Sequence, residues 1–152
     1  LRPYTTLLPK PLVPIGGKYP ILEIVIRQLA ASGFDHITLS VNHLSHLIHS
    51  FFGDGSQWGI KIDYSKEDTP LSTIGPLTLI DDLPENFLVM NGDIITSLNY
   101  GDLLNEHIKG QNQISVASYN REYKIDFGVN VFFPTLFTAL VKSENGFPIY
   151  LV

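Results

Sequence analysis

Apolar and polar residues alternate along this chain with two different periods. Residues 21–32 (ILEIVIRQLAAS) carry apolar positions at helical spacing, with Glu23, Arg27 and Gln28 on one side and Gly33 as a stop signal. Residues 34–41 (FDHITLSV) alternate instead and are rich in β-branched side chains, which is typical of a strand. The pattern therefore predicts a helix followed by a strand.

The same change of period repeats along the rest of the chain. Residues 86–90 (NFLVM) form a continuous apolar run, as in a strand buried on both faces. We expect further helices over 43–52, 73–79 and 98–109 and further strands over 60–64 and 113–119, while 126–134 reads as one strand or two. This alternation predicts an α/β fold with a parallel or mostly parallel sheet and helices on both faces. Ligands of such sheets lie beyond the carboxyl ends of the strands, which directs attention to residues 42–43, 65–72 and 91–97.

Composition narrows the class of protein. A chain of 152 residues predicts one domain, residues 1–152, and its net charge of −5 argues against a nucleic-acid partner. The absence of cysteine excludes disulfides and a cysteine nucleophile and fits a reducing, cytoplasmic location. No apolar run reaches the roughly 18 residues of a membrane span, so no membrane partner is expected.

The opening segment, residues 1–23, combines three cations with rigidity. It contains Arg2, Lys10 and Lys18, five prolines and a Gly16-Gly17 pair. Such a segment suits a loop that holds a polyanion, most often a phosphate chain. Lys10 lies between two prolines that fix its backbone, and a lysine aimed in this way can neutralise charge on a phosphoryl group. The alternative is a solvated loop lysine.

Asn91-Gly92-Asp93 directly follows the buried strand. A carboxylate there would lie in the ligand crevice and suit Mg²⁺, which often takes one or two carboxylates together with water and substrate phosphate oxygens. The same tripeptide is strong turn chemistry, and the sequence leaves the two interpretations equal.

Two other polar segments are weaker candidates. Residues 65–76 (SKEDTPLSTIGP) form a polar loop entering a helix, where Glu67 either meets a ligand or belongs to an ordinary charge run. His43, His46 and His49 are spaced by three rather than as the common zinc pair, so helix surface is favoured over a metal site.

Taken together, these segments resemble the sugar-1-phosphate nucleotidyltransferases, also called nucleotide-sugar pyrophosphorylases. The matches run in the same order as in that family. They are residues 1–6 (LRPYTT) with the family's G-x-G-T-R-L-x-P-x-T, residues 9–14 (PKPLVP) with P-K-P-L-x-P, residues 52–59 with G-D-G-S-x-W-G, residues 67–76 with E-x-x-P-L-G-T-A-G, residues 91–93 with N-G-D, and residues 126–129 with D-F-G-V.

The resemblance implies a fold, a reaction and roles for individual residues. The fold is a Rossmann-like α/β/α sandwich with a mostly parallel central sheet. In the reaction, a sugar 1-phosphate oxygen attacks the α-phosphorus of a nucleoside triphosphate, and a nucleotide-sugar and pyrophosphate form without a covalent enzyme intermediate. The implied roles are triphosphate neutralisation for Arg2 and Lys10, Mg²⁺ binding for Asp93, nucleotide contacts for Glu67, Ser72, Thr73, Asn91 and Gly92, and a sugar contact for Gly128.

The E-x-x-P-L pattern resembles the mannose-1-phosphate guanylyltransferase branch most. A carboxylate at Glu67 suits guanine, which offers two adjacent donors, better than thymine or uracil, which offer one. We therefore expect GTP with mannose 1-phosphate or a related sugar, and the alternative is a glucose-1-phosphate thymidylyl- or uridylyltransferase.

The chain also departs from the family pattern. Ser72 and Ile74 replace the usual glycine and alanine of the base loop, which motivates a second alternative, a non-catalytic nucleotide-sugar sensor on the same fold. A dinucleotide-binding oxidoreductase ranks last, because no G-x-G-x-x-G follows a strand. The glycine-rich loop and the downstream E-K-P and W-x-D-x-G segments are not in the chain, so we expect a domain incomplete at both termini. A homo-oligomer is compatible with the sequence.

Overall fold

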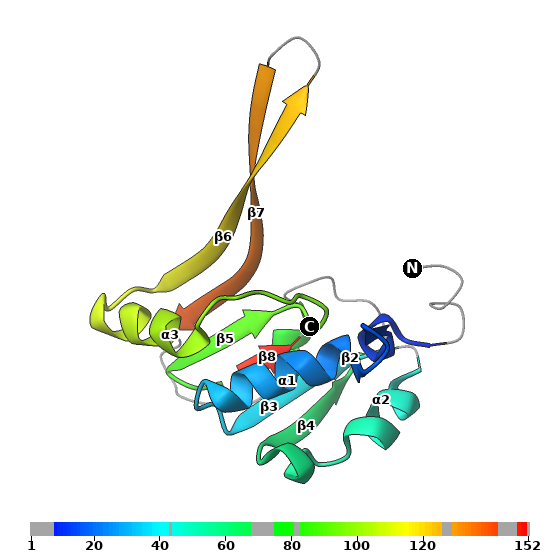
Figure 1. Ribbon diagram of the computed structural model, residues 1–152. Helices are drawn as coiled ribbons and strands as arrows, with labels where there is room; N and C mark the ends of the chain where they lie inside the picture. The colour runs from blue at the N-terminus through cyan, green and yellow to red at the C-terminus, as the bar shows by residue number, and fades with distance from the viewer. Residues whose placement is uncertain are drawn as a thin grey trace.

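A six-stranded sheet with helices packed on it organises the chain (Figure 1). The computed structural model describes residues 8–42, 44–67, 75–80, 83–125, 129–142 and 149–151. The helical elements are η2 (Lys10–Leu12), α1 (Ile21–Ala31), α2 (Ser45–Phe52), η3 (Ser56–Trp58), η4 (Gly75–Leu79) and α3 (Tyr100–Lys109). The strands are β1 (Pro14–Ile15), β2 (Tyr19–Pro20), β3 (His36–Val41), β4 (Lys61–Lys66), β5 (Asn86–Met90), β6 (Ile114–Ile125), β7 (Val129–Lys142) and β8 (Ile149–Leu151).

Parallel pairing forms the centre of the sheet. The strand order is β4-β3-β8-β5-β7-β6, and the pairs β4–β3, β3–β8 and β8–β5 are parallel. The pairs β5–β7 and β7–β6 are antiparallel. This arrangement confirms the predicted α/β class with a mostly parallel sheet.

The predicted elements are found in order, with shifts at their ends. The strands expected over 34–41, 60–64 and 86–90 are β3, β4 and β5, and the helices expected over 21–32 and 43–52 are α1 and α2. The helix expected over 98–109 begins at Tyr100, because the Asn99 side chain accepts hydrogen bonds from the backbone N–H groups of Gly101 and Asp102, 3.0 and 3.2 Å away. The helix expected over 73–79 corresponds to η4, and residues 73 and 74 lie outside the described part.

The C-terminal strands are longer than the sequence predicts. β6 continues past residue 119 to Ile125, and β7 is one strand that runs on to Lys142. Figure 1 shows the two strands leaving the sheet together as a long ribbon. Pro134 is accommodated within β7 because β5 pairs only with Thr138–Lys142, so β7 has a described partner on one side alone at this position.

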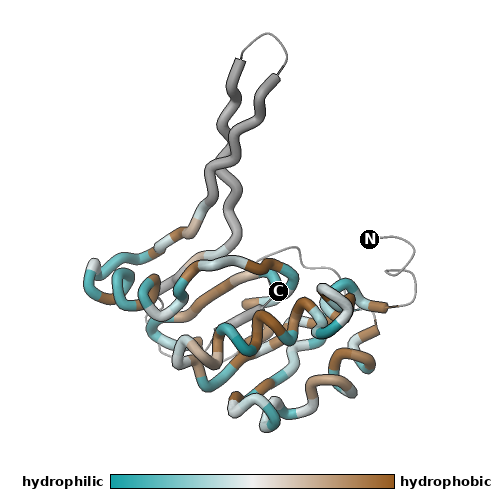
Figure 2. Tube along the Cα trace, in the orientation of Figure 1, coloured by the Kyte–Doolittle hydropathy of each residue, from teal (hydrophilic) through white to brown (hydrophobic). Residues whose placement is uncertain are grey.

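The hydrophobic core lies between one face of the sheet and the helices. In α1 the buried side chains include Val25, Ile26 and Leu29, which follow the helical spacing of the sequence. Alternate residues of the strands meet them, and the brown positions of α1 and its neighbouring strands lie together in Figure 2. The members of this core cluster contributed by other elements include Ile37, Leu39, Val41, Ile48, Phe52, Leu88, Met90 and Tyr100.

None of the helices among the described residues is both long and apolar enough to cross a membrane.

Gly55 tests the packing below η3. Its φ is +82°, and a Cβ there would collide with the carbonyl oxygen of Ile60 and lie 2.6 Å from Cγ1 of Ile62. Gly33 has a similar φ of +89° with no atom within 4 Å, so it is the matched control. Left-handed backbone costs a non-glycine residue roughly 1–2 kcal/mol, and overpacking adds roughly 1–3 kcal/mol. We expect Gly55→Ala to lower the free energy of unfolding in urea by clearly more than Gly33→Ala does, and equal losses would contradict the packing.

Tyr64 on β4 gives a pH-dependent prediction. Its hydroxyl donates to the Gly53 carbonyl at 2.7 Å, and burial, with the Asp54 charge adding to it, raises the pKa of Tyr64 to about 12. A pKa raised in the folded state adds stability that is complete below the ordinary value near 10 and is lost as the pH rises through about 12. Between these values, urea unfolding should weaken more steeply with pH in the wild type than in Tyr64→Phe. Parallel curves would show that Tyr64 ionises alike in both states.

Candidate functional site

A cavity of about 200 Å³ opens at the carboxyl ends of β3 and β5. This is the edge at which parallel α/β sheets bind ligands, as the sequence predicts. The cavity has an apolar wall and a polar rim. The apolar wall comprises Pro11, Leu22, Leu39, Val41 and Ile48, and the rim comprises Lys10, Ser40, Asn91, Gly92 and Asp93.

Lys10 and Asp93 form an ion pair on this rim, although 82 positions separate them in the sequence. The Lys10 side chain is 58% exposed and the Asp93 side chain 20% exposed. Lys10 begins η2, a single turn in which the backbone N–H of Leu12 donates to the Pro9 carbonyl at 2.9 Å. The structure therefore brings two of the predicted site residues together, with opposite charges facing each other.

The segment that carries Lys10 is anchored to the first turn of α1. β1 and β2 form a hairpin whose turn contains Gly16 and Gly17 at φ +59° and +70°, and Lys18 is exposed in this turn. The glycine pair thus serves a tight turn that needs positive φ.

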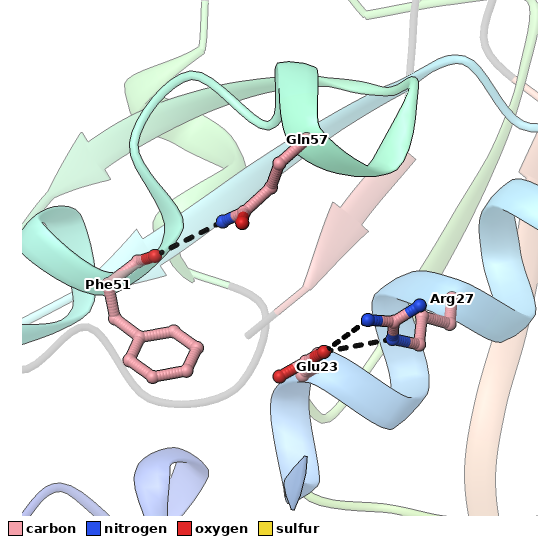
Figure 3. Close-up of polar contacts among 4 residues, drawn as sticks. All are labelled: Glu23, Arg27, Phe51 and Gln57. Carbon is pink, nitrogen blue, oxygen red and sulfur yellow. Dashed lines mark hydrogen bonds and ion pairs between the residues drawn. The ribbon is translucent and has the colours of Figure 1, made fainter.

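A partly exposed ion pair holds the hairpin against α1 (Figure 3). The Glu23 carboxylate is 6% exposed as a residue, and Oε1 accepts hydrogen bonds from Nε and Nη2 of Arg27 at 2.9 and 2.6 Å. The Arg27 guanidinium in turn lies 5.3 Å from the centre of the Tyr19 ring in β2. On the opposite side of the view in Figure 3, Gln57 Nε2 donates to the Phe51 carbonyl at 3.4 Å and joins η3 to α2.

Asn91-Gly92-Asp93 satisfies both interpretations that the sequence leaves open in geometry. The tripeptide leaves β5 in a turn and also lines the cavity. At Gly92 a Cβ would lie 3.3 Å from Cδ1 of Leu22, closer than most real contacts, so a glycine lets the turn approach α1. Asp93 is thereby aimed at the rim of the cavity.

Glu67 lies one residue past the end of β4, beside the carboxyl end of β3. Its backbone N–H donates to the Val41 carbonyl at 3.1 Å, and its Oε1 accepts a hydrogen bond from Oγ of Ser40 at 2.6 Å. Ser40 is the site residue that the sequence analysis missed. The signal available was its position, since it is the penultimate residue of a predicted parallel strand and is polar.

The remaining predicted residues divide into two groups. Within the described part, His49 stacks on Tyr64 with ring centres 4.6 Å apart, and His46 is exposed on α2. No group of three or more His, Cys, Asp or Glu residues there could hold a metal ion. The predicted site residues Arg2, Ser72, Thr73 and Gly128, and also His43, lie outside the described residues.

Known proteins match this chain over most of its length. The family model for nucleotidyl transferases matches residues 1–136. The catalytic subunit beta of mannose-1-phosphate guanylyltransferase from Dictyostelium discoideum is 37% identical over 152 residues, covering 96% of this chain and 39% of that protein. Mannose-1-phosphate guanyltransferase from Yarrowia lipolytica is 35% identical over 138 residues, covering 86% and 37%. The chain thus spans less than half the length of these relatives.

A solved structure agrees with the fold. The crystal structure of HddC from Yersinia pseudotuberculosis complexed with GMP-PN superposes with a TM-score of 0.69 at 20% identity, over 89% of this chain and 68% of that one. At this identity the likeness shows the fold, which is the Rossmann-like α/β fold that the sequence predicts. The match to the family model, over 136 of 152 residues, shows more: the chain belongs to the nucleotidyl transferase family.

Proposed function

We propose that the protein transfers a nucleotidyl group from a nucleoside triphosphate to a sugar 1-phosphate, with GTP and mannose 1-phosphate as the preferred pair. The observation that carries this proposal is the meeting of Lys10 and Asp93 on the rim of a cavity at the carboxyl edge of the sheet. The names of the Dictyostelium and Yarrowia relatives support the choice of substrates.

The reaction needs charge neutralisation and positioning rather than a nucleophilic side chain. An oxygen of the sugar phosphate forms a bond to the α-phosphorus, and the bond from that phosphorus to the pyrophosphate oxygen breaks. Negative charge gathers on the leaving pyrophosphate, where the ammonium of Lys10 stabilises it. Arg2 is assigned the same role on the triphosphate. Asn91 and Gly92 line the nucleotide with Ser72 and Thr73, Glu67 reads the base, and Gly128 contacts the sugar.

The chemistry of Asp93 fits a magnesium ion. Its carboxylate already holds a cationic group, the Lys10 ammonium, and lies at a rim open to solvent. One carboxylate with water and substrate oxygens is a donor set that Mg²⁺ commonly accepts. When bound, the ion would neutralise the phosphate charge of the substrate, and Asp93 would hold it.

Activity is the first test. With GTP, mannose 1-phosphate and Mg²⁺, we expect pyrophosphate release that requires all three. Removing one phosphate-stabilising group typically costs about 100–1000-fold in rate, so Lys10→Met and Asp93→Asn should each lower kcat/KM by about this factor. Lys18→Met is the matched control, because Lys18 is an exposed lysine in the nearby hairpin turn and should leave the rate unchanged.

The same assay separates the alternatives. GTP, dTTP, UTP and CTP are compared with mannose 1-phosphate and glucose 1-phosphate. Equal or better use of dTTP or UTP would replace the guanylyl assignment by a thymidylyl or uridylyl one. Binding of a nucleotide-sugar without any turnover would favour the sensor, and full activity of Asp93→Asn would reject the role of Asp93.

Stability gives an independent prediction for the ion pair. Exposed ion pairs contribute about 0–1 kcal/mol, and the Lys10 side chain is 58% exposed. Lys10→Met and Asp93→Asn should therefore change the free energy of unfolding in urea by less than about 1 kcal/mol. A much larger loss would mean that the pair holds the fold together, and the activity results would then need to be corrected for unfolded protein.

A further inference from the structure

Ser40 stands out because it is bonded to one proposed site residue and lies beside several others. Its Oγ is 2.6 Å from Oε1 of Glu67, the length of a strong hydrogen bond from a hydroxyl to a carboxylate. Ser40 also lines the cavity whose rim carries Lys10 and Asp93. No other side chain is recorded with both features among the described residues.

The backbone fixes where this contact forms. β3 and β4 pair in parallel, with Ser40 opposite Ser65 and Val41 opposite Lys66. One residue further on, the Glu67 N–H donates to the Val41 carbonyl, so the last rung of the ladder holds the backbone of Glu67 beside β3. The carboxylate then turns back along β3 to the hydroxyl of Ser40.

The hydroxyl restricts a side chain that would otherwise be free to rotate. Glu67 is only half-buried, and a glutamate in that setting has several rotamers, including ones that place its carboxylate in water. An ionised carboxylate offers about four lone-pair sites, and the Ser40 bond occupies one of them. The bond therefore sets the direction of the carboxylate and leaves it able to accept two adjacent N–H donors.

We propose that Ser40 is a positioning residue that aims the Glu67 carboxylate at the nucleobase and thereby sets the preference for guanine. The inference deepens the proposed function and rests on it. Guanine presents its ring N–H and its exocyclic amine side by side, so only a carboxylate held in one orientation accepts from both. Hypoxanthine has the ring N–H but lacks the amine, and it reports on this second contact.

The test measures equilibrium binding of GTP and ITP by calorimetry in the presence of Mg²⁺, without sugar phosphate. We expect the wild type to prefer GTP, and Ser40→Ala to weaken GTP binding about tenfold, the effect of one hydrogen bond to a charged group, with ITP affected less. Ser40→Thr keeps a hydroxyl and should restore the preference. Ser65→Ala is the matched control, because Ser65 is the neighbouring serine on β4 and lies outside the cavity wall.

A double-mutant cycle distinguishes positioning from a direct contact. If Ser40 acts through Glu67, Ser40→Ala should have no further effect on GTP binding in Glu67→Gln. An equal loss for GTP and ITP, or an additive effect in Glu67→Gln, would overturn the inference.

The failure of the inference is separable from failure of the proposed function. Pyrophosphate release with no GTP-over-ITP preference would leave nucleotidyl transfer standing and reject the role of Ser40 and Glu67. No pyrophosphate release with any nucleotide, together with no nucleotide binding, would reject both.

Discussion

Parallel pairing of β3, β4 and β5 across the centre of the sheet is the constraint on which the site depends. Because parallel strands run the same way, every segment that leaves a carboxyl end emerges at one edge. Ser40 and Glu67 reach that edge from β3 and β4, and Asp93 reaches it from β5. The site is therefore assembled from short connections on a rigid sheet, and the Lys10 segment closes over it from the other end of the sequence.

Side-chain periodicity predicts the elements that bury one stripe or both faces. α1 and β5 are recognised for this reason, since the burial of their side chains repeats the pattern of the sequence. The outer part of β6 and β7 lacks such a pattern. Residues 120–124 (NREYK) are mostly polar, yet their backbone pairs with β7, and ladder hydrogen bonds do not depend on side-chain identity. β8 is missed for a related reason, because three residues become a strand only when two neighbours, β3 and β5, supply partners on both sides.

The site shows the same division between local and distant information. Pro9, Pro11 and the N-G-D turn make Lys10 and Asp93 recognisable as candidates from their local sequence. Their contact with each other, and that of Ser40 with Glu67 across 27 positions, depend on how distant segments are brought together. The Gly16-Gly17 pair shows the converse, since its local chemistry is explained by a hairpin turn within the segment that carries Lys10.

The ion pair between Lys10 and Asp93 also gives the cavity an exchangeable internal counterion. The two charges compensate each other, so neither is left unbalanced at the rim. A cation that takes the carboxylate frees the ammonium, and an anion that takes the ammonium frees the carboxylate. By thermodynamic reciprocity, each ligand then lowers the cost of binding the other by the same free energy. A salt made of both ions thus meets a smaller barrier at this rim than either ion does alone.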